Sequence, residues 1–150
     1  MALFNLTEFL LPPGLRLLGL DPGGKRIGVA LSDVGRRVAS PYGVLARAKL
    51  KVNAAEIAAI AAREGAGGLI IGLPLDGDGF GPRAQAARDW AHALSAATGL
   101  PAALQDESFT TADAHERLIQ GGVSRARRAE LVDKMAAAAI LQAALDRINK

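Results

Sequence analysis

Three carboxylates stand where they could share one catalytic site: Asp21, Glu107 and Asp133. Two carboxylates about 4 Å apart repel each other by roughly 4 kcal/mol at an effective dielectric constant near 20. Such a cluster therefore needs a counter-charge or a raised pKa. A divalent cation supplies the counter-charge, and an all-oxygen ligand set suits Mg²⁺ or Mn²⁺ rather than zinc. If the three acids converge, the sequence predicts a divalent metal site.

Asp21 ends an apolar run at residues 17–20 and is followed by a glycine turn and a second apolar run at 27–31. A run that is apolar on both faces is typical of a strand buried in the middle of a sheet. An unpaired carboxylate there is costly, so a basic side chain, a hydrogen-bonded turn or a metal ion must compensate it. In the second run Gly28, Ala30 and Ser32 share one face. This small face leaves room beside Asp21 for backbone, a helix or substrate.

Glu107 follows the last predicted strand, at the carboxyl end where open α/β sheets place their ligands. If this strand runs parallel to the first one, Glu107 and Asp21 lie near the same edge. Asp133 heads an apolar stripe on the closing helix, formed at helical spacing by Ala136, Ala137, Ile140 and Ala144. A carboxylate at the head of a buried stripe either meets a basic partner or points into a polar cavity.

The elements that must position these acids are predicted from apolar spacing, glycines, prolines and helix caps. Strands at 15–20, 27–32 and about 39–45 have short glycine-bearing links and predict an antiparallel meander. Helices and strands then alternate: helix 52–64, strand 68–72, helix 82–98, strand 101–107, helix from Thr110 or Thr111 to 120, and a helix from Ser124 to about 148. The expected fold class is α/β, with a five-stranded mixed sheet, three antiparallel strands then two parallel, and helices on both faces.

Length and composition narrow the class of protein. The 150 residues predict a single domain at 15–150 after an N-terminal extension at 1–14. The chain has no cysteine, which is compatible with the cytoplasm and removes thiolate metal sites. The first residues make a poor signal peptide and no apolar run is long enough to span a bilayer, so we expect a soluble protein with no membrane partner.

An excess of basic over acidic residues favours a phosphate-rich partner. Lys and Arg number 18 against 15 Asp and Glu, and the pI is near 9.7. Aromatic residues are only 4% of the chain, which argues against a single-strand binder built on base stacking. Candidate phosphate contacts are Lys25, Arg26, Arg83, Arg125 and Arg128. Solvated surface charge is the alternative for each of them.

Two further features have both a functional and a structural interpretation. Thr111 is a candidate substrate contact, and its hydroxyl could instead cap the helix that follows. The glycine-rich loop at 73–81 could close over substrate or simply connect a strand to a helix. The two histidines, His92 and His115, fall on predicted surface helices, so they do not compete with the acids as metal ligands.

Four motifs in order resemble the YqgF/RuvX family over about residues 15–146: L-G-L-D-P-G-G-K-R-I-G-V-A-L-S-D, I-I-G-L-P-L followed by G-P-R-A, D-E-S-F-T-T, and G-V-S-R-A-R-R-A-E-L-V-D-K-M-A-A-A-A-I-L. This ribonuclease H-like family is described as Holliday junction resolvase-like and as pre-16S rRNA nucleases. The resemblance implies that Asp21, Glu107 and Asp133 are catalytic and hold two Mg²⁺ or Mn²⁺ ions for phosphodiester hydrolysis at the 5′ end of pre-16S rRNA. Ser108 stands where the family usually has arginine.

Other functions stay open at the level of the sequence. The same acids could cleave branched or single-stranded DNA, and junction resolution would need two sites related by the symmetry of a homodimer, whereas a monomer suffices for RNA cleavage. Actin-like ATPases also place Asp-x-Gly between two strands, but they pair two such domains. An RNA- or ribosome-associated binding module with weak or no cleavage is a further alternative, which Ser108 keeps open.

Overall fold

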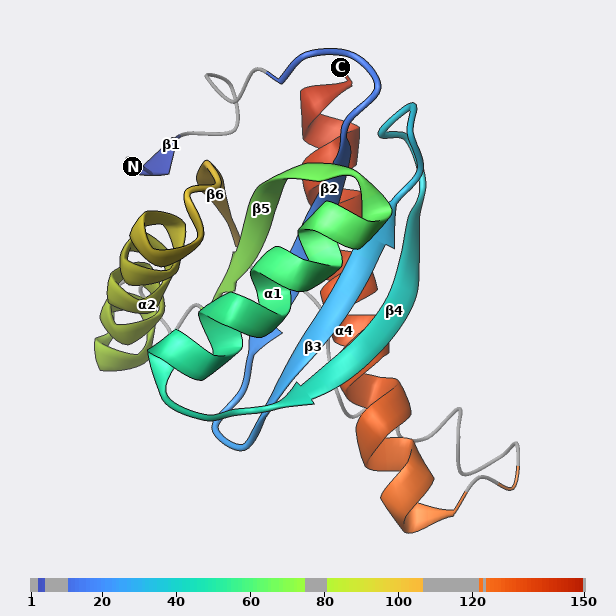
Figure 1. Ribbon diagram of the computed structural model, residues 1–150. Helices are drawn as coiled ribbons and strands as arrows, with labels where there is room; N and C mark the ends of the chain where they lie inside the picture. Colours follow the sequence, from blue (N-terminus) through green and yellow to red (C-terminus); the bar gives the residue numbers. More distant parts are fainter. Residues whose placement is uncertain (1–2, 5–10, 75–80, 107–121, 123, 150) are drawn as a thin grey trace.

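A mixed six-stranded sheet organises the protein, in the order β1-β6-β5-β2-β3-β4 (Figure 1). The computed structural model describes residues 3–4, 11–74, 81–106, 122 and 124–149. Antiparallel pairing joins β2 (Arg16–Pro22) to β3 (Arg26–Ser32) and β3 to β4 (Ala39–Ala46), while β5 (Ala66–Leu73) and β6 (Ala102–Asp106) run parallel to β2. The five expected strands and their mixed pattern are confirmed.

A sixth strand comes from the segment that the sequence analysis placed before the domain. Strand β1 (Leu3–Phe4) pairs in parallel with β6 at the edge of the sheet. Two residues carry too little periodicity to be recognised as a strand from sequence. Part of the expected extension at 1–14 therefore joins the sheet, and the wider division of the chain stays a prediction.

Helices cover both faces of the sheet, because its central strands are apolar on both sides. Helices α1 (Leu50–Glu64) and α2 (Pro82–Thr98) pack on the face that carries Leu18 and Leu20. Helix α4 (Arg125–Ile148) packs on the opposite face, against Leu17 and Ile70. Figure 1 shows α1 in front of the sheet and α4 behind it. No helix in the described ranges is long and apolar enough to cross a membrane.

The helix ends follow the signals in the sequence. Gly65 and Gly99 end α1 and α2 in the left-handed conformation, with φ of 71° and 75°. Pro82 occupies the first turn of α2, and the Ser124 hydroxyl accepts a hydrogen bond from the Arg127 N–H at the start of α4. The helix expected at 110–120 lies outside the described residues.

Helix α1 begins two residues earlier than expected, and Asn53 in its first turn explains the difference. The Asn53 side chain is fully buried. Its amide oxygen accepts from the Ala48 N–H at 2.8 Å, and its amide nitrogen donates to the Ala46 carbonyl at 3.0 Å. These bonds fix the connection between β4 and α1 and satisfy backbone groups that the helix cannot pair.

We expect Asn53→Ala to lower the free energy of unfolding by about 1–3 kcal/mol, because it leaves two backbone groups without their partner. Urea denaturation measures this change. Gln85→Ala is the matched control, since the Gln85 side chain is exposed and its amide nitrogen donates to Asp89, and its effect should stay within about 0.5 kcal/mol. Equal, small effects for both variants would show that the buried amide does not fix this connection.

Candidate active site

The carboxyl ends of β2, β5 and β6 meet at one edge of the sheet, because these neighbouring strands are parallel. Asp21 lies at this edge, paired with Gly28 across the β2–β3 ladder. Strand β6 ends at Asp106, and Glu107 lies outside the described residues. In Figure 1 the β2–β3 turn and the starts of α1, α2 and α4 all lie at the lower end of the molecule.

Asp21 lies on the face of the sheet that α4 covers. Gly19, two residues earlier and on the same face, is so close to α4 that a Cβ built on it would be 2.6 Å from the Leu141 Cβ. Directly opposite residues of an antiparallel pair also share a face, so Asp21 and Gly28 both face α4.

Gly28 is the point where α4 touches the sheet at Asp133. A Cβ built on Gly28 would overlap the Asp133 carbonyl oxygen. The apolar stripe that Asp133 heads is buried, with Ala137 fully inaccessible and Ile140 2% exposed. The room that the small face of β3 was expected to leave is therefore filled by the backbone of a helix. The backbones at two of the three predicted acids, Asp21 and Asp133, therefore both lie next to Gly28.

Asp133 forms an ion pair with Arg26, one of the two outcomes expected for a carboxylate at the head of a buried stripe. The Arg26 Nε lies 2.5 Å from Asp133 Oδ2, and the two side chains are 42% and 25% exposed. Ion pairs with this much exposure contribute little to stability. The pair compensates the charge of the Asp133 carboxylate, which is the structural alternative that its position had left open.

The other predicted phosphate contacts surround the same edge from distant parts of the chain. Lys25 is exposed on the β2–β3 turn, Arg83 on the first turn of α2, and Arg125 and Arg128 are on the first turn of α4. Helix N-termini add positive partial charge at this end. Thr111 lies outside the described residues, as do residues 75–80 of the predicted mobile loop.

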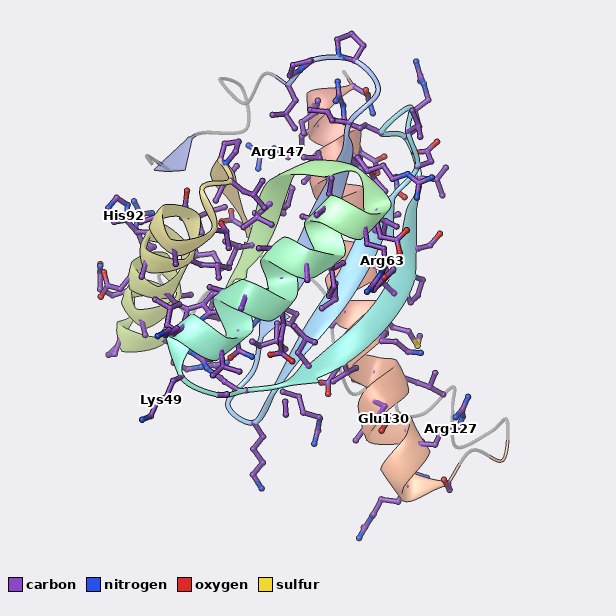
Figure 2. All side chains as sticks on the ribbon, in the orientation of Figure 1. Lys49, Arg63, His92, Arg127, Glu130 and Arg147 are labelled. Carbon is purple, nitrogen blue, oxygen red and sulfur yellow. The ribbon has the colours of Figure 1, made fainter. Side chains whose placement is uncertain are left out.

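Figure 2 labels further basic side chains near this end of the molecule, together with His92. Lys49 lies at the start of α1 and Arg127 at the start of α4, both in the lower part of the view. His92 is exposed on the outer side of α2, as expected, and His115 lies outside the described residues.

The residues present fit a divalent metal ion. Asp21 and Asp133 offer the hard oxygen ligands that Mg²⁺ and Mn²⁺ prefer, and Asp133 already binds a cationic group. Within the described ranges, which leave out Glu107, no three acidic or histidine side chains form a cluster that could hold a metal. The role of Glu107 as the third ligand stays a prediction.

Lowered pKa values occur at the opposite end of the sheet. Backbone N–H groups of Val38 and Arg37 donate to Asp33 after β3 and hold the pKa of that carboxyl below its usual value. The Tyr42 hydroxyl donates to Glu64 at the end of α1 and lowers the pKa of that carboxyl. These hydrogen bonds fix a turn and a helix end, and they assign no catalytic role.

Two residues beside the acids were missed by the sequence analysis. The Arg47 guanidinium lies 5.5 Å from the centre of the Trp90 ring, next to the β2–β3 turn. Arg47 belongs to a basic cluster before α1, and Trp90 is on α2. Their sequence separation hides the contact, so only the folded chain reveals it.

The fold resembles those of two solved resolvases. Thermus thermophilus RuvC in complex with a Holliday junction substrate matches with a TM-score of 0.54 and 15% identity, over 91% of this chain and 97% of RuvC. The Fowlpox virus resolvase, in complex with substrate Holliday junction DNA, matches with a TM-score of 0.56 and 11% identity, over 91% and 100% of the two chains. These matches show a shared ribonuclease H-like fold.

Sequence comparison places the chain in a family. A protein of Acidiphilium cryptum is 57% identical over 100% of this chain and 97% of its own length. One of Gluconacetobacter diazotrophicus is 59% identical over 97% of each chain. Both have the name "Putative pre-16S rRNA nuclease". The family model described as RuvX, Holliday junction resolvase, matches residues 15–147. The chain therefore belongs to the RuvX family, as its motifs indicated.

Proposed function

We propose that this protein is a metal-dependent nuclease that hydrolyses phosphodiester bonds in the processing of the 5′ end of pre-16S rRNA. One observation carries the proposal: the backbones at Asp21 and Asp133 both lie next to Gly28, at the carboxyl edge of the sheet. The basic residues at the same edge and the names of the relatives support it. A role in rRNA processing would place the protein in the cytoplasm.

The proposed ligands are Asp21, Glu107 and Asp133, for two Mg²⁺ or Mn²⁺ ions. When bound, the ions would supply Lewis-acid stabilisation of the phosphate and an activated water. The protein supplies position: Asp21 is fixed by the β2–β3 ladder, and Asp133 by the packing of α4 on Gly28.

The basic residues of this edge have a separate role in the proposal. They would bind the nucleic-acid strand through its phosphates, without reading its sequence. The residues proposed for this role are Lys25, Arg26, Arg83, Arg125 and Arg128.

In this proposal a metal ion would displace Arg26 from Asp133, since the guanidinium and the metal ion need the same carboxylate. We expect Arg26→Gln to bind Mn²⁺ about two- to fivefold more tightly, the range that loss of a competing exposed ion pair allows. Isothermal titration calorimetry with Mn²⁺ alone measures this. Lys25→Gln removes the same charge from the neighbouring residue and should change the affinity less. Weaker Mn²⁺ binding by Arg26→Gln would contradict the exchange.

The decisive comparison uses three substrates under Mg²⁺ and Mn²⁺: a pre-16S rRNA fragment, single strands and a four-way DNA junction. The Asp21→Asn variant serves as the inactive control. Cleavage of the rRNA precursor at its 5′ end, absent with Asp21→Asn, is expected. Binding of the precursor without turnover under either ion would instead identify a binding module.

Junction resolution is a second candidate, favoured by the description of the family model. Cutting both strands symmetrically needs two sites related by the two-fold axis of a homodimer. Sedimentation measured with the junction bound separates the candidates. A strict monomer would count against resolution and is compatible with rRNA cleavage.

A further inference from the structure

A cavity of about 430 Å³ is lined by residues of β3, β4 and the N-terminal half of α4: Arg26, Gly43, Val44, Ala46, Glu130 and Lys134. Arg26 is two residues before Gly28 on β3, so both face α4, and Ala46 is opposite Arg26 in the β3–β4 ladder. The cavity therefore lies on the face of the sheet that carries Asp21 and packs against Asp133.

The Arg26 side chain connects this cavity to the candidate active site. Its Nε donates to Asp133 Oδ2 at 2.5 Å, and 42% of the side chain stays exposed. A guanidinium has five N–H donors, so this hydrogen bond leaves donors for a second acceptor. Arg26 is thus equipped to contact another carboxylate at the cavity.

Glu130 supplies a second carboxylate beside Asp133. It is exposed on α4, three residues before Asp133 (Figure 2). Residues three apart on a helix are neighbours, with Cβ atoms about 5–6 Å apart. A guanidinium that contacts Asp133 is therefore one helical turn from Glu130, and Arg26 and Glu130 line the same cavity.

Lys134 is the competing partner for Glu130 at this cavity. It is four residues after Glu130 on α4, a spacing that favours an ion pair on a helix surface. The ion pairs between described residues nevertheless include none from Glu130 to Lys134 or to any other described cation. The Glu130 carboxylate is therefore available to Arg26.

We propose that Glu130 is a positioning residue, which receives the Arg26 guanidinium when a metal ion takes the Asp133 carboxylate. The inference rests on the metal site of the proposed function. In the metal-free protein Arg26 compensates the charge of Asp133, and in the metal-bound protein Glu130 holds Arg26 away from the ion. The guanidinium stays beside the site, where its remaining donors can contact a phosphate of the bound strand.

Calorimetry of the full chain with Mn²⁺ tests this transfer of Arg26 through a double-mutant cycle. Glu130→Gln should weaken Mn²⁺ binding about two- to threefold, because the displaced guanidinium loses an exposed ion pair. In the Arg26→Gln protein the same substitution should change the affinity by less than about 1.5-fold, since no guanidinium needs a new partner. Asp146→Asn, an exposed carboxylate near the other end of α4, is the matched control and should leave the affinity unchanged.

The Nε–H resonance of Arg26 gives a second readout, which a purely structural role of Glu130 would not move. It is assigned by its absence from Arg26→Gln and followed by ¹⁵N NMR during titration with Mg²⁺, which is diamagnetic. In the wild-type protein we expect it to shift and stay sharp, because the guanidinium passes from one carboxylate to another. In Glu130→Gln it should broaden when Mg²⁺ is added, as the released N–H exchanges with water.

An equal loss of Mn²⁺ affinity from Glu130→Gln in both backgrounds would identify simple charge attraction and overturn the transfer. Broadening of the Arg26 resonance in the wild-type protein would also overturn it. The proposed nuclease function fails separately: the expected cycle without cleavage of the rRNA precursor under Mn²⁺ contradicts the nuclease and supports the transfer. A wild-type protein that binds no Mn²⁺ contradicts both.

Discussion

Asp21→Asn is expected to reduce metal-dependent cleavage by about 10³-fold or more while the protein stays folded. The change keeps the size of the side chain but removes a charged oxygen ligand, and metal ions in such sites supply several kcal/mol of transition-state stabilisation. Asp21 comes from a strand in the middle of the sheet and is paired with Gly28, so the backbone at this position should stay in place. Cleavage of the pre-16S rRNA fragment and Mn²⁺ calorimetry measure the two effects.

Asp89→Asn is the matched control for this prediction. Asp89 is an exposed carboxylate on α2 that accepts a hydrogen bond from Gln85. The same chemical change there should leave both cleavage and Mn²⁺ affinity at the wild-type level. Cleavage by Asp21→Asn at more than a tenth of the wild-type rate would remove Asp21 from the catalytic centre.

Gly28→Ala is expected to damage both the fold and the site. The added Cβ would overlap the Asp133 carbonyl, which is backbone and cannot rotate away. Overpacking of this kind costs about 1–3 kcal/mol and sometimes more. If α4 shifts by about 1 Å to make room, the displaced Asp133 would lower the cleavage rate by a further factor of about 10².

Gly43→Ala tests whether the effect belongs to Gly28 or to any strand glycine. Gly43 lies on β4, and a Cβ built on it meets nothing within 4 Å. We expect its free energy of unfolding and its cleavage rate to stay near the wild-type values. Urea denaturation and the rRNA cleavage assay, run on both variants, give the comparison. A Gly28→Ala protein as stable and active as Gly43→Ala would mean that α4 does not rest on Gly28 in solution.

Local sequence signals were enough for most of the elements. Helix α2 begins at Pro82 and ends before Gly99, because proline and glycine have strong backbone preferences at those positions. The short glycine-bearing link between the two apolar runs predicted the antiparallel pairing of β2 and β3, and the stripe below Asp133 predicted which side of α4 is buried. Periodicity and caps are local properties, so they can be recognised without knowing the fold.

Contacts between distant residues could not be predicted in the same way. The sequence indicated space beside Asp21 but not that the backbone at Asp133 fills it. Arg26 and Asp133 are 107 residues apart, so their pairing depends on how α4 docks. Arg47 precedes α1 and Trp90 is on α2, so their contact depends on how α2 packs beside this connection. Each of these contacts is a product of tertiary packing.

The docking of α4 on Gly28 also sets the order in which the site can be assembled during synthesis. All the strands in the described part of the chain precede α4, so the sheet and Asp21 leave the ribosome before Asp133 does. Until α4 has emerged and docked, the growing chain has the first acid but not its counterpart. A nuclease built in this way would become able to cut RNA only after its last described helix is in place.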